Sequence, residues 1–410
     1  MTRPDEQPAA EPYAGPPPTR RPDPWQAGQL RPPPWAAPGP LPGYGPAYGP
    51  PAGAWGPPGP WGPPGPWGPP GPWGPPGPVP LPPAVRWDPP PGTPPHDEPQ
   101  PFLHAMRSRT WAWWRPLAGL VLLGVVYVVA SMVVVLVTVL TGITPDLALL
   151  DLVDPATLLV TNLSLILFVP AVWLAWTVAH GMRLGWSASV LARLRPRLLL
   201  PYTLLALATL GPAIVLSIGL GALLDQESVT GPVPSLLWLL LVVFLTTPLQ
   251  SAAEEYLFRG YLSQAVAGWF RSHRAGALVA GVLTAAVFSL AHAPPDVWTF
   301  LDRFVFALAA SATVWLTGGL EAAIVLHAVN NVLVFVLAGL LGDGVATSEI
   351  PSGTGALLVL VTLLSMAAYV ALVARSRARL HPELATTAQD LRPATAAAGP
   401  PWAAAPQPAR

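Results

Sequence analysis

Long apolar runs, separated by short polar or proline-containing segments, fill the chain between roughly residue 115 and residue 380. An α-helix needs about 20 apolar residues to cross the ~30 Å hydrocarbon layer of a bilayer, and most of these runs reach that length. Lipid offers no hydrogen-bond partners to an irregular backbone, so runs of this kind form helices. The pattern predicts about eight membrane-spanning helices, near residues 117–141, 156–179, 198–223, 235–263, 275–293, 300–317, 320–340 and 353–374.

Composition agrees with this interpretation and narrows the chemistry. Of the 410 residues, 52% are hydrophobic and only 10% are charged, which is too apolar for an ordinary soluble domain. The predicted fold class is therefore all-α: a polytopic membrane helical bundle. A net charge of zero gives no reason to expect a nucleic-acid partner. The absence of cysteine and lysine excludes disulfides, thiolate metal ligands, a cysteine nucleophile and Schiff-base chemistry.

The distribution of proline separates the terminal regions of the chain from its apolar centre. Most of the 58 prolines lie before residue 105 or after residue 381. From Gly56 the sequence repeats GPPGPW, which is typical of a polyproline-II spacer or interaction tail that forms no core. We therefore expect a disordered Pro/Gly/Trp-rich tail over 1–104, a transmembrane bundle over 105–380 and a disordered Ala/Pro-rich tail over 381–410. The tryptophans of the first tail could bind a partner that the sequence does not identify.

Charge asymmetry predicts the orientation in the membrane. Arginines gather before the first span, in 180–197, in 264–274 and after the last span, whereas the alternate loops carry mainly Asp and Glu. By the positive-inside rule, both termini face the cytoplasm, which is consistent with an even number of spans. The expected location is the cell membrane, with a multi-pass topology.

Several polar residues interrupt the apolar helices at positions where an unpaired charge is costly. Glu255 and Arg259 are spaced i,i+4 with the acid first, the favoured order for an ion pair. Glu254 points about 100° away on the helix and lacks that partner, which suits a general base. Glu321, at the start of the seventh helix, is interpreted as a structural carboxylate at the positive helix end.

Two histidines on later helices accompany the glutamates. Glu254 and His292 lie equally far along the chain from residue 273, in the hairpin between the fourth and fifth helices. Two continuous antiparallel helices would therefore place the carboxylate and the imidazole at the same depth. On the seventh helix, His327 and Asn331 share one face. A lone histidine or asparagine in such a helix is usually a packing residue, but their coincidence with the glutamates favours a site.

Together these elements resemble the signature of the CPBP intramembrane proteases, the CAAX-prenyl-endopeptidase and bacteriocin-processing group. The motifs are EExxxR (Glu254, Glu255, Arg259), FxxxH (Phe288, His292) and HxxxN (His327, Asn331). The resemblance covers about 235–340, the expected catalytic core, and implies peptide-bond cleavage within the membrane. By carry-over, Glu254 and His292 would activate water, His327 and Asn331 would bind the oxyanion, and Glu255 and Arg259 would brace the site.

The resemblance leaves the cofactor and the substrate open. Glu254, His292 and His327 could instead ligate zinc, although a glutamate mechanism without metal is favoured. HExxH, GxGD and GxSxG motifs are absent. A non-catalytic scaffold, a regulatory binder or a transporter is the alternative, but the spans show no internal repeat of the kind many transporters have. The lack of lysine is compatible with a GC-rich bacterial genome, so the expected substrate is a membrane-associated peptide or protein.

Overall fold

The computed structural model describes residues 93–142, 153–224, 230–342 and 353–389. Within these ranges eight helical segments are long and apolar enough to cross a membrane, which confirms the predicted all-helical class and the number of spans. By the length and composition of its helices, the chain is a multi-pass membrane protein. The spans are Arg115–Thr141, Pro155–Val178, Pro196–Leu224, Leu236–Gly268, His273–Ala291, Val297–Thr317, Glu321–Leu341 and Gly355–Leu380.

Several of these spans are single helices and two are composite. The single helices are α2 (Arg115–Thr141), α5 (Pro196–Leu224), α8 (His273–Ala291), α9 (Val297–Thr317), α10 (Glu321–Leu341) and α11 (Gly355–Leu380). The second span consists of α3 (Pro155–Ile166) and α4 (Phe168–Val178). The fourth consists of α6 (Leu236–Leu257), the π-helix η4 (Phe258–Leu262) and α7 (Ser263–Gly268). Two short 3₁₀ turns, η2 (Phe102–His104) and η3 (Leu184–Ser187), lie outside the spans.

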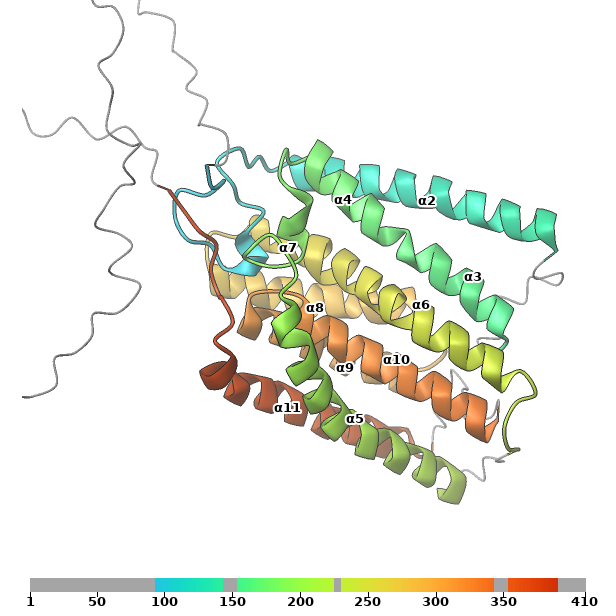
Figure 1. Cartoon of the computed structure of the whole chain (residues 1–410). Helices are drawn as coiled ribbons and strands as arrows, with labels where there is room; N and C mark the ends of the chain where they lie inside the picture. The colour runs from blue at the N-terminus through green and yellow to red at the C-terminus, as the bar shows by residue number, and fades with distance from the viewer. Residues whose placement is uncertain (1–92, 143–152, 225–229, 343–352, 390–410) are drawn as a thin grey trace, which may run out of the picture. The chain divides into compact units, whose positions relative to one another are not determined.

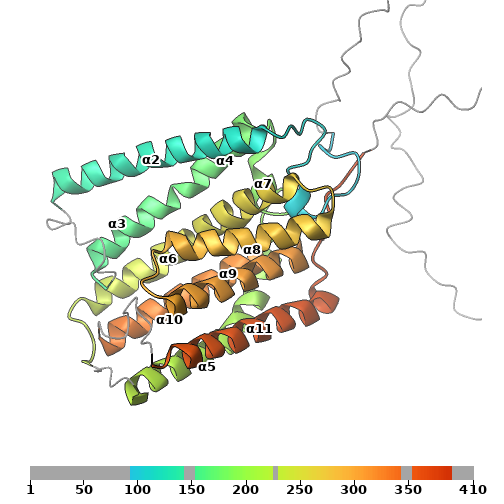
Figure 2. The same cartoon turned by 180° about the vertical axis from the view of Figure 1, so that it is seen from behind.

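The helices form a bundle with a central group and two flanks (Figures 1 and 2). In the central group α6 packs against α10, α10 against α9, and α9 against α8. One flank is made by α2, α3 and α4, which pack against one another and onto α6. The other is made by α5 and α11, which contact each other as well as α10 and α9, respectively. The helices that carry the predicted motifs are thus all central.

Local sequence explains the breaks in the composite spans. The second span breaks at Leu167 because the ring of Pro170 excludes the carbonyl of Ile166, where α3 ends. In the fourth span the backbone changes to a π-helix at Phe258, three residues after Glu255, whereas the sequence predicts a continuous α-helix. Gly260 lies in this turn, and a Cβ there would come within 2.6 Å of the Ser187 carbonyl oxygen. π-turns of this kind occur frequently at functional sites.

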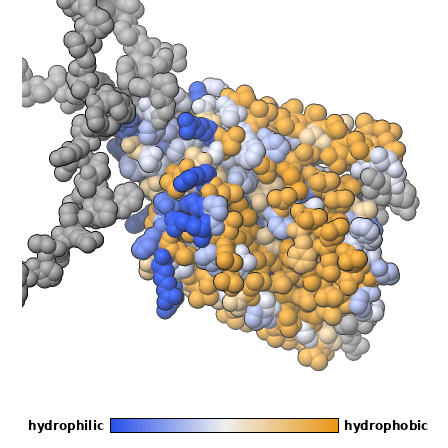
Figure 3. All heavy atoms as spheres, viewed as in Figure 1, coloured by the Kyte–Doolittle hydropathy of each residue, from blue (hydrophilic) through white to orange (hydrophobic). Residues whose placement is uncertain are grey.

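The surface of the bundle separates into an apolar band and a polar end. Figure 3 shows hydrophobic residues over most of the visible face, with hydrophilic residues gathered at the end where α2 begins and α11 ends. Arg197, Arg271 and Arg379 are exposed at helix ends on this side. The arginine-rich end predicted from the sequence is therefore a single face of the bundle.

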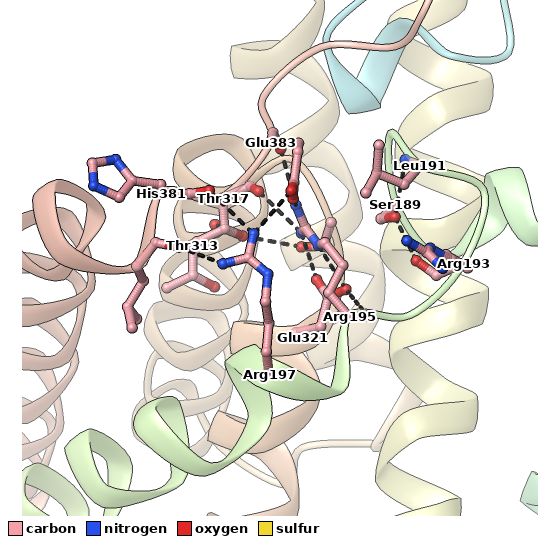
Figure 4. A network of polar contacts seen from close by, with 12 residues as sticks. Ser189, Leu191, Arg193, Arg195, Arg197, Thr313, Thr317, Glu321, His381 and Glu383 are labelled. Atoms are coloured by element: carbon pink, nitrogen blue, oxygen red, sulfur yellow. Dashed lines mark hydrogen bonds and ion pairs between the residues drawn. The ribbon is translucent and has the colours of Figure 1, made fainter. Parts of the chain in front are cut away.

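A buried ion-pair network lies at the same end (Figure 4). Arg195 donates from Nε and Nη2 to the two carboxylate oxygens of Glu321 at 2.9 and 2.6 Å, and its backbone N–H adds a third bond at 2.8 Å. Its Nη1 donates to the carbonyl oxygen of Glu383 at 2.9 Å. Glu321, at the start of α10, is thus bound by an arginine that is distant in sequence. The sequence predicted only an interaction with the positive end of its own helix.

The segments next to the predicted tails are packed against the bundle. Most of the predicted tails 1–104 and 381–410 lies outside the described residues. In the described part, however, Phe102 and Leu103 are buried. The backbone N–H of Thr386 donates to the Gln100 carbonyl oxygen at 2.8 Å. The packed unit therefore extends beyond the expected boundaries at both ends, because apolar side chains and backbone groups there find partners.

Candidate active site

The Glu255–Arg259 ion pair lies buried beneath the other residues of the candidate site. Arg259 Nη1 donates to Glu255 Oε1 at 2.8 Å, and both side chains are fully buried. Arg259 Nη2 donates to the Ala307 carbonyl oxygen on α9 at 2.9 Å, and its guanidinium lies 5.1 Å from the Phe288 ring centroid. The predicted i,i+4 ion pair is confirmed, and it ties α6 to α8 and α9.

Glu254 points in a different direction from Glu255, as the helix geometry predicts, and lies near both histidines. Its Oε2 lies 3.9 Å from His292 Nε2 and 3.7 Å from His327 Nε2. Among the described residues this oxygen accepts no hydrogen bond although it is buried. A buried acceptor without a donor is unusual and favours a position that water or substrate occupies. The equal depth predicted for Glu254 and His292 is also confirmed by this distance.

The two histidines differ in exposure and in what holds them. His292 follows the last residue of α8, and its side chain is 34% exposed, so water can reach it. Its Nδ1 lies 2.8 Å from the Phe288 carbonyl oxygen. His327 is buried on α10, and its Nδ1 lies 3.0 Å from Glu255 Oε1. The Phe288 ring packs against both imidazoles, with centroids 4.5 and 5.7 Å apart, which accounts for the phenylalanine of the FxxxH motif.

These contacts determine which imidazole nitrogens carry hydrogen. A backbone carbonyl only accepts, so Nδ1 of His292 carries the proton and a neutral His292 presents a lone pair at Nε2. The Glu255 carboxylate, paired with Arg259, likewise accepts a hydrogen bond from Nδ1–H of His327, so this nitrogen also carries hydrogen. Both Nε2 atoms lie near Glu254 Oε2. When both imidazoles are neutral, a ligand between these three atoms donates hydrogen bonds or carries positive charge.

Asn331 joins the site through a residue that the sequence reasoning missed. Asn331 Nδ2 lies 3.4 Å from Gln250 Oε1 and 3.4 Å from Ser251 Oγ. Gln250 in turn donates from Nε2 to Glu254 Oε1 at 2.6 Å. Gln250 therefore connects the free carboxylate to the asparagine of α10. Its i,i+4 spacing from Glu254 on the same helix was the available signal.

A cavity of about 650 Å³ adjoins these side chains. Glu254, His292, His327 and Asn331 line it, together with Gln250. Further lining residues come from α3, the second half of α5, the first half of α9, the middle of α10 and the first half of α11. From Glu254 the cavity thus extends toward the bundle end opposite the arginine-rich face. A cavity of this size holds a drug-sized ligand or a short peptide segment.

The donor set offers little support for a metal centre. In the part of the chain that the structure describes, no group of three or more His, Asp or Glu residues lies close enough to hold a metal ion. His327 Nδ1 is engaged by Glu255, and Gln250 engages Glu254 Oε1. The zinc set of Glu254, His292 and His327 stays a prediction.

Sequence comparison agrees with this geometry. A model of the family described as Rce1-like, type II CAAX prenyl endopeptidase, matches residues 233–333, about a quarter of the chain. The matched segment contains all the motif residues, from Glu254 to Asn331. The resemblance to the CPBP family is thereby confirmed over this segment, and the match supports a CAAX-type intramembrane protease. Neither curated proteins nor solved structures give a match.

Proposed function

We propose that the protein is an intramembrane endopeptidase that hydrolyses a peptide bond of a membrane-associated protein or peptide. The observation that carries the proposal is the convergence of Glu254 Oε2, His292 Nε2 and His327 Nε2 within 3.9 Å at the wall of the cavity. A water molecule placed there donates hydrogen bonds to Glu254 and His292. Glu254 takes one proton as the water oxygen attacks the scissile carbonyl, and then delivers it to the leaving amine.

Charge balance supports a role for His327 in binding the oxyanion. Glu254 and Glu255 carry two negative charges and Arg259 one positive charge, so the buried cluster is neutral when His327 is protonated. In that form Nδ1 keeps its bond to Glu255 and Nε2 becomes a donor. His327 and the Asn331 amide then bind the oxyanion of the tetrahedral intermediate, an effect worth about 2.7–4 kcal/mol per donor in other hydrolases. Glu255 and Arg259 hold His327 in place.

The direction of the cavity bears on the side of the membrane from which substrate enters. With the arginine-rich end cytoplasmic by the positive-inside rule, the cavity lies in the half of the bundle nearer the opposite membrane surface. Because the cavity reaches Glu254 without crossing the arginine-rich face, substrate and water enter from the hydrocarbon layer or from the non-cytoplasmic side.

The test is peptide cleavage by the full-length protein in detergent micelles. Internally quenched apolar peptides serve as probes, and cleavage positions are read by mass spectrometry. Glu254→Gln and His292→Ala are each expected to lower kcat/KM by about 10²–10⁴-fold, the range typical of a lost general base. Asp97→Asn, which changes a partly exposed carboxylate outside the cavity wall, is the control and is expected to keep nearly full activity.

Two outcomes would overturn parts of the proposal. Unchanged activity in both Glu254→Gln and His292→Ala would remove the catalytic assignment and favour a non-catalytic binder. Loss of activity with a chelator, restored by zinc, would replace direct water activation by Glu254 with a metal-dependent reaction.

A further inference from the structure

Arg303 is a cation in the cavity wall that the proposed chemistry does not use. It lies on the second turn of α9, and the cavity that contains Glu254 and His292 also contains this side chain. Among the described residues its guanidinium makes one hydrogen bond, from Nη1 to the His292 carbonyl oxygen at 3.1 Å. That bond holds the positive charge of Arg303 close to His292, whose imidazole is part of the proposed active site.

Two carboxylates, Asp302 and Asp296, lie near Arg303. Asp302 is also in the cavity wall, near Thr362 on α11. Asp296 accepts hydrogen bonds from the backbone of Trp298 and Thr299 and from the Thr299 hydroxyl, and thereby caps α9. Both acids attract Arg303 electrostatically. Arg303 nevertheless keeps guanidinium N–H groups available for a ligand.

A guanidinium with spare donors in a largely apolar cavity matches a carboxylate in both charge and shape. Its planar fork can form two parallel hydrogen bonds with a carboxylate. A cavity of about 650 Å³ holds only a few residues of peptide, so an anion bound at Arg303 lies close along the chain to the bond at Glu254.

We propose that Arg303 binds a carboxylate of the substrate, either its C-terminal α-carboxylate or an acidic side chain, a few residues from the scissile bond. The proposal rests on the proposed protease function and makes Arg303 a determinant of substrate specificity. A substrate without such a carboxylate leaves the Arg303 charge without its ligand in the cavity and binds less tightly.

The test measures binding separately from turnover. The probe is a fluorescein-labelled apolar octapeptide in three forms: a free C-terminal acid, its amide, and an amide with one internal glutamate. Fluorescence anisotropy is recorded with full-length protein in micelles, in the Glu254→Gln background so that no peptide is cut. Arg303→Gln is compared with Arg303→Lys and with Arg274→Gln, which alters an exposed arginine at the start of α8.

We expect at least one carboxylate-bearing form to bind about tenfold or more tightly than the plain amide, a typical gain for a hydrogen bond to a charged group. Arg303→Gln should abolish this difference and leave binding of the plain amide unchanged. Arg303→Lys should retain part of it, and Arg274→Gln all of it. Which form gains identifies the source of the carboxylate.

Two results would overturn the assignment of Arg303. One is equal binding of all three peptides before Arg303 is changed. The other is an equal loss for all three in Arg303→Gln, which would indicate a structural role or a lipid phosphate as the ligand. Failure of the protease function would show separately, as no cleavage by the unaltered protein or as cleavage that Glu254→Gln does not diminish.

Discussion

The bundle contains two buried arginine–glutamate pairs that differ in how completely they are satisfied. Arg195 donates two parallel side-chain hydrogen bonds to Glu321. Its guanidinium also donates to the carbonyl oxygens of Thr317 and Glu383. Arg259 and Glu255 share a single bond. Among the described residues, Arg259 Nε and Glu255 Oε2 are buried without a partner, as is Oε2 of the adjacent Glu254.

We interpret this difference as that between a structural network around Arg195 and the proposed catalytic cluster around Glu254. Buried polar groups are normally satisfied, since an orphaned donor or acceptor costs about 1–3 kcal/mol. The Arg195 network meets that rule and joins the start of α5, the start of α10 and the C-terminal segment. The Glu254–Glu255 cluster violates it beside a cavity. Its carboxylate oxygens can accept hydrogen bonds from water or substrate, and proteins tend to tolerate such violations at functional sites.

The largest effect that distinguishes the two pairs is expected from Arg195→Ala. Removing the arginine leaves Glu321 charged, buried and unpaired, which destabilises a protein by about 3–5 kcal/mol. The thermal unfolding midpoint in detergent should fall clearly, whereas activity per folded molecule should be retained. Arg193→Ala, a change at an exposed arginine two residues away, is the control and should leave the midpoint nearly unchanged.

A double replacement sharpens this prediction. Arg195→Met combined with Glu321→Met removes both charges and should recover much of the lost stability, because apolar residues often replace a buried ion pair without cost. Equal unfolding midpoints for Arg195→Ala and Arg193→Ala would show that the network is not structural.

Asn331→Ala tests the proposed catalytic cluster through the residue proposed to bind the oxyanion. Loss of one such donor is expected to lower kcat by about 10²–10³-fold with little change in KM, because the bond forms mainly in the transition state. Asn330→Ala is the matched control: this amide lines the same cavity and donates to Asn331 Oδ1 at 3.2 Å. Its loss should cost less than tenfold. Equal losses in the two variants would remove the oxyanion role from Asn331.

The sequence predicted the parts of both regions that depend on helical periodicity. Apolar run length located the spans, and i,i+4 spacing predicted the Glu255–Arg259 bond. Equal distance from a hairpin predicted that Glu254 and His292 meet. Each of these predictions uses only the rise and turn of an α-helix.

The parts that it did not predict depend on contacts between distant segments. Glu321 was assigned to the positive end of its own helix, yet Arg195, its partner, lies 126 residues away. Nothing local signals that pairing. The π-turn after Glu255 was also missed, since it arises where Gly260 packs closely against the Ser187 backbone. Gln250 was overlooked because a glutamine in a helix has no special chemistry until its partner is known.

Gln250→Leu is expected to lower activity less than Asn331→Ala does. It removes the 2.6 Å bond that orients Glu254 and the contact with Asn331. A hydrogen bond to a charged group is worth about 1.5–3 kcal/mol, so kcat/KM should fall about 10–100-fold. In the Glu254→Gln background the same change should cost little, because a positioning residue acts through the residue that it orients. Additive losses would show that Gln250 acts independently of Glu254.

The smallest expected effect concerns the exposed edge of the structural network, and acid should remove it. Burial alone would raise the pKa of Glu383. Its own backbone hydrogen bond and the charges of Arg197 and Arg195 outweigh burial and hold the pKa below the usual 4.5. A depressed carboxylate pKa stabilises the folded state above the unfolded-state pKa, and this contribution is lost as the pH falls through the folded-state pKa.

Hydrogen exchange of the 382–389 backbone measures this contribution. Glu383 is 38% exposed, so the contribution should stay below about 1 kcal/mol, as for other solvent-accessible ion pairs. Protection should be constant from pH 7 to about 5 and then decrease below the usual carboxyl range near 4.5. In Glu383→Gln this decrease should be absent and protection should be low throughout. A decrease that persists in Glu383→Gln would assign the acid sensitivity to another group and leave Glu383 outside the network that Arg195 organises.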